Sequence, residues 1–164
     1  MDAGTPLNVG CSAPKPLKTC ENLRAIEWFL YPASSPAMST IRVLVIDDNE
    51  AHAQGLAELL ELSGFATVYA TTGAGGLELA LNATVDAVLL DLNLPDMTGY
   101  EVCYRLRSNP ATANLAIVFH TAANSATVDH QGDAFLTYPV EMGHICHVIQ
   151  GCVARRKIAM SSSS

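Results

Sequence analysis

The sequence predicts an α/β fold of the doubly wound type, in which a five-stranded parallel sheet lies between two layers of helices. Short apolar segments alternate with segments of helical periodicity, which is typical of repeated strand–helix–strand units. The apolar segments are almost continuous, as expected for strands that are covered on both faces. Right-handed crossovers then place helices on both sides of one sheet. In this fold class, ligands bind at the carboxyl ends of the strands.

The expected strands and helices alternate between residues 41 and 158. Asn49 is the expected N-cap of the first helix, and Gly64 is expected to end it. Met142, Ile145 and Ile149 share one face of the last expected helix. The expected strands are residues 41–46, 65–70, 86–91, 115–119 and 133–137, and the intervening helices are residues 50–63, 73–81, 100–107 and 124–130.

Composition divides the chain into three parts. Residues 1–37 contain five of the eight prolines and are interpreted as an N-terminal extension and linker. Residues 38–158 carry all the expected strands and are interpreted as one compact domain. Residues 159–164, which end in four serines, are expected to be a disordered tail.

Charge and cysteine content exclude several classes of partner and location. Residues 38–158 contain six Lys and Arg against thirteen Asp and Glu, which accounts for the whole net charge of −7. An acidic domain of this kind is not expected to bind nucleic acid, and no apolar run is long enough to span a membrane. The five cysteines form no CxxC pair, which favours free thiols in a reducing, cytoplasmic location.

Polar residues follow four of the expected strands and should meet at one edge of the sheet. They are Asp47, Asp48, Asp91, Thr121 and Tyr138. Three neighbouring carboxylates repel one another unless one is protonated or a cation binds among them. An oxygen-only ligand set with few carboxylates suits Mg²⁺. An aspartate beside that ion can act as a nucleophile toward a phosphoryl group, and Thr121 could donate to a phosphoryl oxygen.

These motifs together resemble a response-regulator receiver domain of two-component signalling, similar to CheY. The resemblance is carried by Asp47-Asp48, by Asp91-Leu-Asn-Leu-Pro-Asp-Met-Thr-Gly99, by His120-Thr121-Ala122 and by Phe135-Leu-Thr-Tyr-Pro139. It covers about residues 41–157 and implies the strand order 2-1-3-4-5.

The resemblance also implies a role for each site residue. Asp91 would be the phosphoacceptor, and Asp48 and Asp91 would bind Mg²⁺ directly. Asp47 would bind the metal through water, and Asn93 would bind it through its backbone carbonyl. Thr121 would be the switch hydroxyl, and Phe135 the aromatic residue whose rotamer follows it.

One position departs from the family pattern. The family places a lysine before the proline that follows the fifth strand, and this chain has Tyr138 there. The only lysines are Lys15, Lys18 and Lys157. A tyrosine hydroxyl can donate one hydrogen bond but brings no positive charge. The expected result is a domain that accepts phosphate on Asp91 but switches weakly.

The predicted function is that of a receiver and not of a stand-alone enzyme. It would take a phosphoryl group from a histidine kinase or a histidine phosphotransfer protein and signal to a downstream protein by contact. By the resemblance, that contact would use the fourth helix, fifth strand and fifth helix. The alternative is a phosphorylation-independent interaction module, favoured by Tyr138 and by the short segment between Thr121 and Tyr138. A metal-dependent phosphatase is disfavoured, because neither a cap insert nor a substrate-binding lysine is found.

Overall fold

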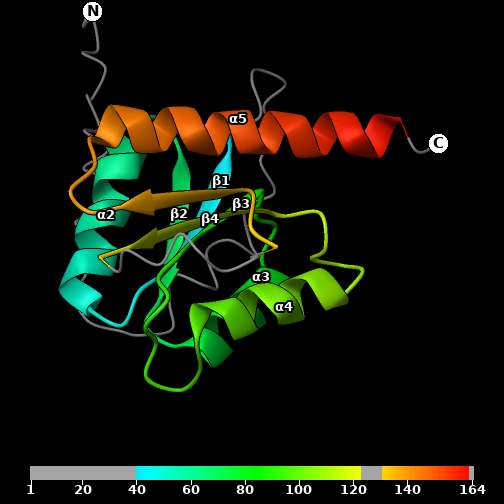
Figure 1. Ribbon diagram of the computed structural model, residues 1–164. Helices are drawn as coiled ribbons and strands as arrows, with labels where there is room; N and C mark the ends of the chain where they lie inside the picture. The colour runs from blue at the N-terminus through cyan, green and yellow to red at the C-terminus, as the bar shows by residue number, and fades with distance from the viewer. Residues whose placement is uncertain (1–39, 123–130, 163–164) are drawn as a thin grey trace, which may run out of the picture.

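The computed structural model describes residues 40–122 and 131–162 and contains one parallel sheet (Figure 1). The strands lie in the order β2-β1-β3-β4-β5, and each neighbouring pair is parallel. The predicted fold class and strand order are therefore confirmed. The strands are β1 (Arg42–Ile46), β2 (Ala66–Ala70), β3 (Ala87–Leu90), β4 (Ala116–Thr121) and β5 (Ala134–Thr137).

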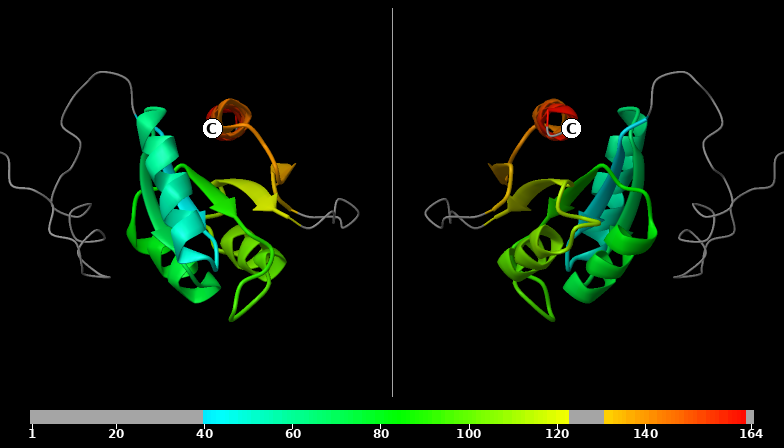
Figure 2. Two further views of the ribbon diagram at one scale, coloured as in Figure 1. Left: turned by 90° about the vertical axis from the view of Figure 1, so that its left-hand side faces the viewer. Right: turned by 90° about the vertical axis from the view of Figure 1, so that its right-hand side faces the viewer.

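Among the described residues, helices cover both faces of the sheet (Figures 1 and 2). Helices α2 (Glu50–Leu62) and α5 (Met142–Ser161) pack on one face, and α3 (Gly73–Asn82) and α4 (Gly99–Ser108) pack on the other. All residues of β3 and β4 are buried, because these central strands have helices on both sides. No helix in residues 40–122 and 131–162 combines the length and apolar character that crossing a bilayer requires.

Side chains just ahead of three helices fix where those helices begin. The Asn49 side chain accepts a hydrogen bond from the His52 backbone N–H at 3.1 Å, which confirms its predicted capping role. Thr72 and Thr98 accept equivalent bonds at the starts of α3 and α4. Gly64 adopts a φ of 91° after α2, a conformation that a side chain would disfavour. The helices that border the expected site therefore begin at positions set by local sequence.

Two boundaries differ from the sequence-based expectation by more than one residue. Strand β4 continues through His120 and Thr121, because its pairing with β5 extends to Thr121. Helix α5 continues to Ser161, beyond the expected domain end at residue 158, and the hydroxyls of Ser161 and Ser162 bond the Ile158 carbonyl. The extension over residues 1–37 and the helix expected at residues 124–130 lie outside the described residues.

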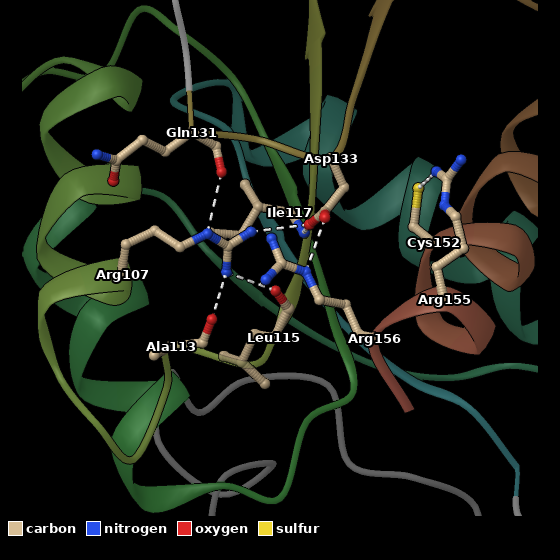
Figure 3. A network of polar contacts seen from close by, with 9 residues as sticks. All are labelled: Arg107, Ala113, Leu115, Ile117, Gln131, Asp133, Cys152, Arg155 and Arg156. Carbon is tan, nitrogen blue, oxygen red and sulfur yellow. Dashed lines mark hydrogen bonds and ion pairs between the residues drawn. The ribbon is translucent and has the colours of Figure 1, made fainter. Parts of the chain in front are cut away.

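Asp133 ties α4, β4 and α5 together at the edge of the sheet where the strands begin (Figure 3). Its carboxylate accepts hydrogen bonds from the Ile117 backbone N–H at 2.8 Å, from Arg107 at 2.8 Å and from Arg156 at 2.7 Å. Arg107 also donates to the carbonyls of Ala113 and Leu115. Both Arg107 and Asp133 are largely buried, so each charge depends on the other for compensation.

The first prediction concerns the stability that this network provides. Replacing Asp133 with Asn should lower the free energy of unfolding by about 2 to 3 kcal/mol, because two guanidinium groups lose their charged partner. Glu101→Gln is the matched control: it breaks the exposed Glu101–Arg105 pair and should cost less than about 0.5 kcal/mol. Urea unfolding measures both values, and equal losses in the two variants would contradict the expectation.

Candidate functional site

Three aspartates meet at the carboxyl ends of β1 and β3. One carboxylate oxygen from each of Asp47, Asp48 and Asp91 lies within 4.8 Å of the other two. Asp47 and Asp48 directly follow β1, and the Asp91 backbone N–H donates to the Ile46 carbonyl at 2.9 Å, which holds the two strand ends together. Asp47 is buried, Asp91 is partly buried and Asp48 is exposed. Three hard oxygen ligands in one group fit Mg²⁺, with one side open to water.

Asp91 is held by hydrogen bonds to its carboxylate. The Thr121 hydroxyl bonds this carboxylate, and the Leu92 backbone N–H donates to Oδ1 at 2.7 Å. Desolvation by burial raises the pKa of Asp91 above its usual value, although the Thr121 and Leu92 bonds act against the rise. Thr121 itself is fully buried. The structure thus joins the candidate phosphoacceptor and the candidate switch hydroxyl, as the sequence predicts.

The loop after β3 turns sharply and passes close to Asp91. Asn93 and Thr98 form an antiparallel bridge, and the Gly99 N–H donates to the Leu92 carbonyl at 2.8 Å. A Cβ atom at Gly99 would lie 2.2 Å from the Asp91 carbonyl oxygen, so only glycine fits. Asn93 lies in this loop and is exposed. The role of its carbonyl as a metal ligand stays a prediction.

Asp96 has a structural role that the sequence pattern does not reveal. Its two carboxylate oxygens accept hydrogen bonds from the backbone N–H groups of Gly73 and Ala74, each at 2.8 Å. These bonds, first to Ala74 and then to Gly73, lower the pKa of Asp96. The loop that follows the acceptor is therefore fastened to the start of α3. The same bonds occupy the amides at that helix terminus.

Tyr138 occupies the position of the family lysine, and its hydroxyl bonds Asp47. The hydroxyl donates to Asp47 Oδ2 at 3.4 Å and lies 3.2 Å from His52 Nδ1. The Tyr138 backbone N–H donates to the Thr121 carbonyl at 3.1 Å, which places this residue beside the end of β4. Burial and then the charge of Asp47 raise the pKa of Tyr138, so the phenol keeps its proton.

Two histidines complete this side of the site. His52 Nδ1 lies 2.5 Å from Asp47 Oδ2, and its ring packs edge-on against Tyr138. His120 is 3% exposed, meets Tyr138 edge-on with centroids 4.1 Å apart, and stacks on His52 at 6.0 Å. Its Nε2 has no hydrogen-bond partner among the described residues. Burial, followed by the neighbouring His52, lowers the pKa of His120 to about 4.

Phe135 packs on the opposite face of the sheet. Its ring lies 5.9 Å from Phe119, which in turn lies 5.4 Å from Tyr100 of α4. Phe135 is paired in register with Phe119 across β4 and β5, and it is partly buried. This packing explains the conformation of the aromatic ring without phosphorylation. Its switch role stays a prediction.

The described lysine cannot replace the missing cation. Lys157 Nζ lies 3.2 Å from Asp86, which directly precedes β3. Asp91 directly follows that strand, so Lys157 is at the opposite end of the sheet. Lys15 and Lys18 lie outside the described residues.

Sequence reasoning identified the acids, Thr121 and Tyr138, and missed His52. The one available signal was its place in the first turn of the helix that follows Asp47-Asp48. His120, which the sequence analysis gave no role of its own, is almost completely buried near the end of β4.

A second prediction follows from the buried, neutral His120. The unfolded chain binds a proton on this histidine below its ordinary pKa of 6.5, whereas the folded chain does so only near pH 4. Stability should therefore fall by up to about 3 kcal/mol as the pH drops through this window. Denaturant unfolding at several pH values measures the slope. In His120→Phe, which keeps a ring but cannot titrate, the slope should be smaller; an unchanged slope would contradict the account.

Comparisons with known proteins agree with this geometry. Residues 43–150 match the model of the response regulator receiver domain. The regulator RpaA of Synechocystis sp., described as DNA-binding, is 31% identical over 70% of this chain and 49% of its own length. The cell cycle response regulator CtrA of Brucella ovis is 33% identical over 71% of this chain and 52% of its own. The chain thus spans about half the length of these relatives.

A solved structure gives the same fold. The receiver domain of a sensor histidine kinase from Pseudomonas aeruginosa, which has a magnesium ion in its active-site cleft, superposes with a TM-score of 0.65 at 20% identity. The match covers 71% of this chain and 99% of that one. Because the family model matches more than half of the sequence, the chain belongs to the response regulator receiver domain family.

Proposed function

We propose that this receiver accepts a phosphoryl group on Asp91 from a histidine kinase or a histidine phosphotransfer protein. The observation that carries the proposal is the placement of Asp91. Its carboxylate lies among two further carboxylates and is hydrogen-bonded to the buried Thr121 hydroxyl. A nucleophile, a cation site and a hydroxyl donor therefore meet at one point, as phosphoryl transfer requires.

The transfer step uses groups of this chain for positioning. A carboxylate oxygen of Asp91 forms the new bond to phosphorus while the bond from phosphorus to the donor imidazole nitrogen breaks, and that nitrogen keeps the electron pair. Asp48 and Asp91 would hold Mg²⁺ directly, with Asp47 acting through water and Asn93 through its carbonyl. The ion would offset the negative charge that gathers on the phosphoryl oxygens. Thr121 would then bond one of those oxygens.

Signalling would proceed by contact with a downstream protein in the cytoplasm. The proposed contact region is the surface of β5 and α5, by analogy with the family; the fourth helix expected at residues 124–130 lies outside the described residues. RpaA is described as a DNA-binding regulator, and this chain covers half of that protein. The expectation of no nucleic-acid contact therefore applies only to the acidic receiver segment, in which acids outnumber bases thirteen to six.

Tyr138 is the reason to propose weak switching. The family lysine would form a charge-assisted bond to the phosphorylated aspartate, whereas the Tyr138 hydroxyl is neutral and bonds Asp47. A charge-assisted hydrogen bond contributes about 1.5 to 3 kcal/mol, which corresponds to about a tenfold to hundredfold change in an equilibrium. Phosphorylation should therefore shift the conformational equilibrium less than in receivers that have the lysine. The alternative function, a phosphorylation-independent interaction module, rests on the same observation.

The third prediction tests acceptance itself. Treatment of the chain with a small phosphodonor and Mg²⁺ should give an acid-stable, base-labile adduct that intact-mass spectrometry detects. Asp91→Asn should abolish the adduct, and Asp86→Asn, at the other end of β3, should leave it intact. If the native chain forms no adduct, the phosphorylation-independent function is favoured instead.

The fourth prediction tests the switch. Tyr138→Lys should increase the conformational response to phosphorylation by about tenfold or more, because it restores the charged partner. Amide chemical-shift changes at Thr121 and Phe135, recorded with and without the phosphodonor, report the response. Tyr138→Phe adds no charge and serves as the control. An equal response in the native chain and in Tyr138→Lys would show that the missing charge is not what limits switching.

A further inference from the structure

Both oxygens of the Asp47 carboxylate already accept hydrogen bonds from the protein. Oδ1 accepts the Asn49 backbone N–H at 2.9 Å, and Oδ2 accepts His52 Nδ1 at 2.5 Å and the Tyr138 hydroxyl at 3.4 Å. The Asp47 side chain is 5% exposed. A carboxylate offers about four acceptor positions, so three are in use here.

The two side-chain donors are held in place by packing. His52 comes from α2 and Tyr138 follows β5, and their rings meet edge-on with an interplanar angle of 87°. His120 of β4 lies against both rings and is almost completely buried. Three elements that are distant in sequence thus bring the donors to Asp47, and the His52 side chain remains 38% exposed.

The other two acids are placed differently. Asp48 is exposed, and in the described part of the chain its side chain has no hydrogen-bond donor of this kind. Asp91 accepts bonds from the Thr121 hydroxyl and from a backbone N–H, and it is only partly buried. Asp48 and Asp91 can therefore bind a cation without first breaking a hydrogen bond to a donor that is packed among aromatic rings.

We propose that His52 and Tyr138 are positioning residues that restrain the Asp47 carboxylate and so weaken its water-mediated contribution to divalent-cation binding, which leaves Asp48 and Asp91 as the main ligands. This inference rests on the proposed function only in taking the acid cluster as the divalent-cation site. Two donors on Oδ2 compete with the metal, or with a metal-bound water, for the same lone pairs. Cation binding through Asp47 Oδ2 then requires at least one of these two hydrogen bonds to break.

The opposite outcome has an equally clear physical basis. Hydrogen bonds to a metal ligand can orient that ligand. Loss of the residue that makes such a bond commonly weakens metal binding by about tenfold or more. If His52 and Tyr138 prepare Asp47 as a ligand, their removal must weaken cation binding. The direction of the change therefore separates the two roles.

The experiment measures the affinity of the whole chain for Mg²⁺ at one fixed pH by titration calorimetry. His52→Ala and Tyr138→Phe should each bind Mg²⁺ more tightly, by about threefold to tenfold, since each removes one competing hydrogen bond. His147→Ala, an exposed histidine on α5, should bind as the native chain does. Circular dichroism confirms that each variant is folded, and Tyr138→Phe keeps the ring packing.

A double-mutant cycle with Asp47→Asn makes the test specific. In the native background Asp47→Asn should weaken Mg²⁺ binding by about threefold, through the lost charge, and in the His52→Ala background it should weaken it by about tenfold or more. Weaker binding by His52→Ala or Tyr138→Phe, unchanged binding, or no binding by any of these chains would each overturn the proposal. The Asp91 adduct is measured separately, so the proposed phosphoacceptor function can stand or fall independently of this result.

Discussion

Electrostatic repulsion among three carboxylates at one edge of the sheet is the constraint on which the site depends. Each close pair costs about 1 to 4 kcal/mol at a surface-like dielectric. The structure relieves part of this cost through the Thr121 hydroxyl at Asp91, the donors at Asp47 and the exposure of Asp48 to water. What remains favours a bound cation, and that residual charge is what can attract Mg²⁺ and position a phosphoryl group.

At the opposite edge of the sheet, buried charge is compensated by ion pairs within the protein. One carboxylate, Asp133, is shared by Arg107 and Arg156, and Arg107 also binds carbonyls at the start of β4. The strands are thereby fixed at the end where they begin. The carboxyl ends carry the weaker, mostly neutral contacts of Tyr138, His120 and Thr121. The two ends of the sheet therefore differ in how charge is compensated, by ion pairs with arginines at one end and by few donors around three carboxylates at the other.

Most of the fold and the reactive groups could be predicted, because they depend on local pattern. Apolar runs place the strands, and the residues that follow them must meet at one edge. His52, Asp96 and Asp133 could not be assigned roles, since each acts across a distance in sequence: His52 toward β5, Asp96 toward α3, and Asp133 toward two arginines. The sequence predicts a strand over residues 115–119, and pairing with β5, which the local sequence does not reveal, extends β4 through His120 and Thr121.

Tyr138 links the two unusual properties of this receiver, and its substitutions separate them. Its neutral hydroxyl supplies no charge to a phosphorylated Asp91, and the same hydroxyl bonds Asp47. Tyr138→Phe removes only the hydrogen bond and keeps the ring against His52 and His120, whereas Tyr138→Lys removes the bond and the ring and adds a charge. The lost hydrogen bond affects cation binding before any phosphoryl group arrives. The added charge also acts on the phosphorylated state of Asp91. Both variants lose the bond to Asp47, so a response that is gained in Tyr138→Lys and absent in Tyr138→Phe comes from the lysine and not from the released Asp47.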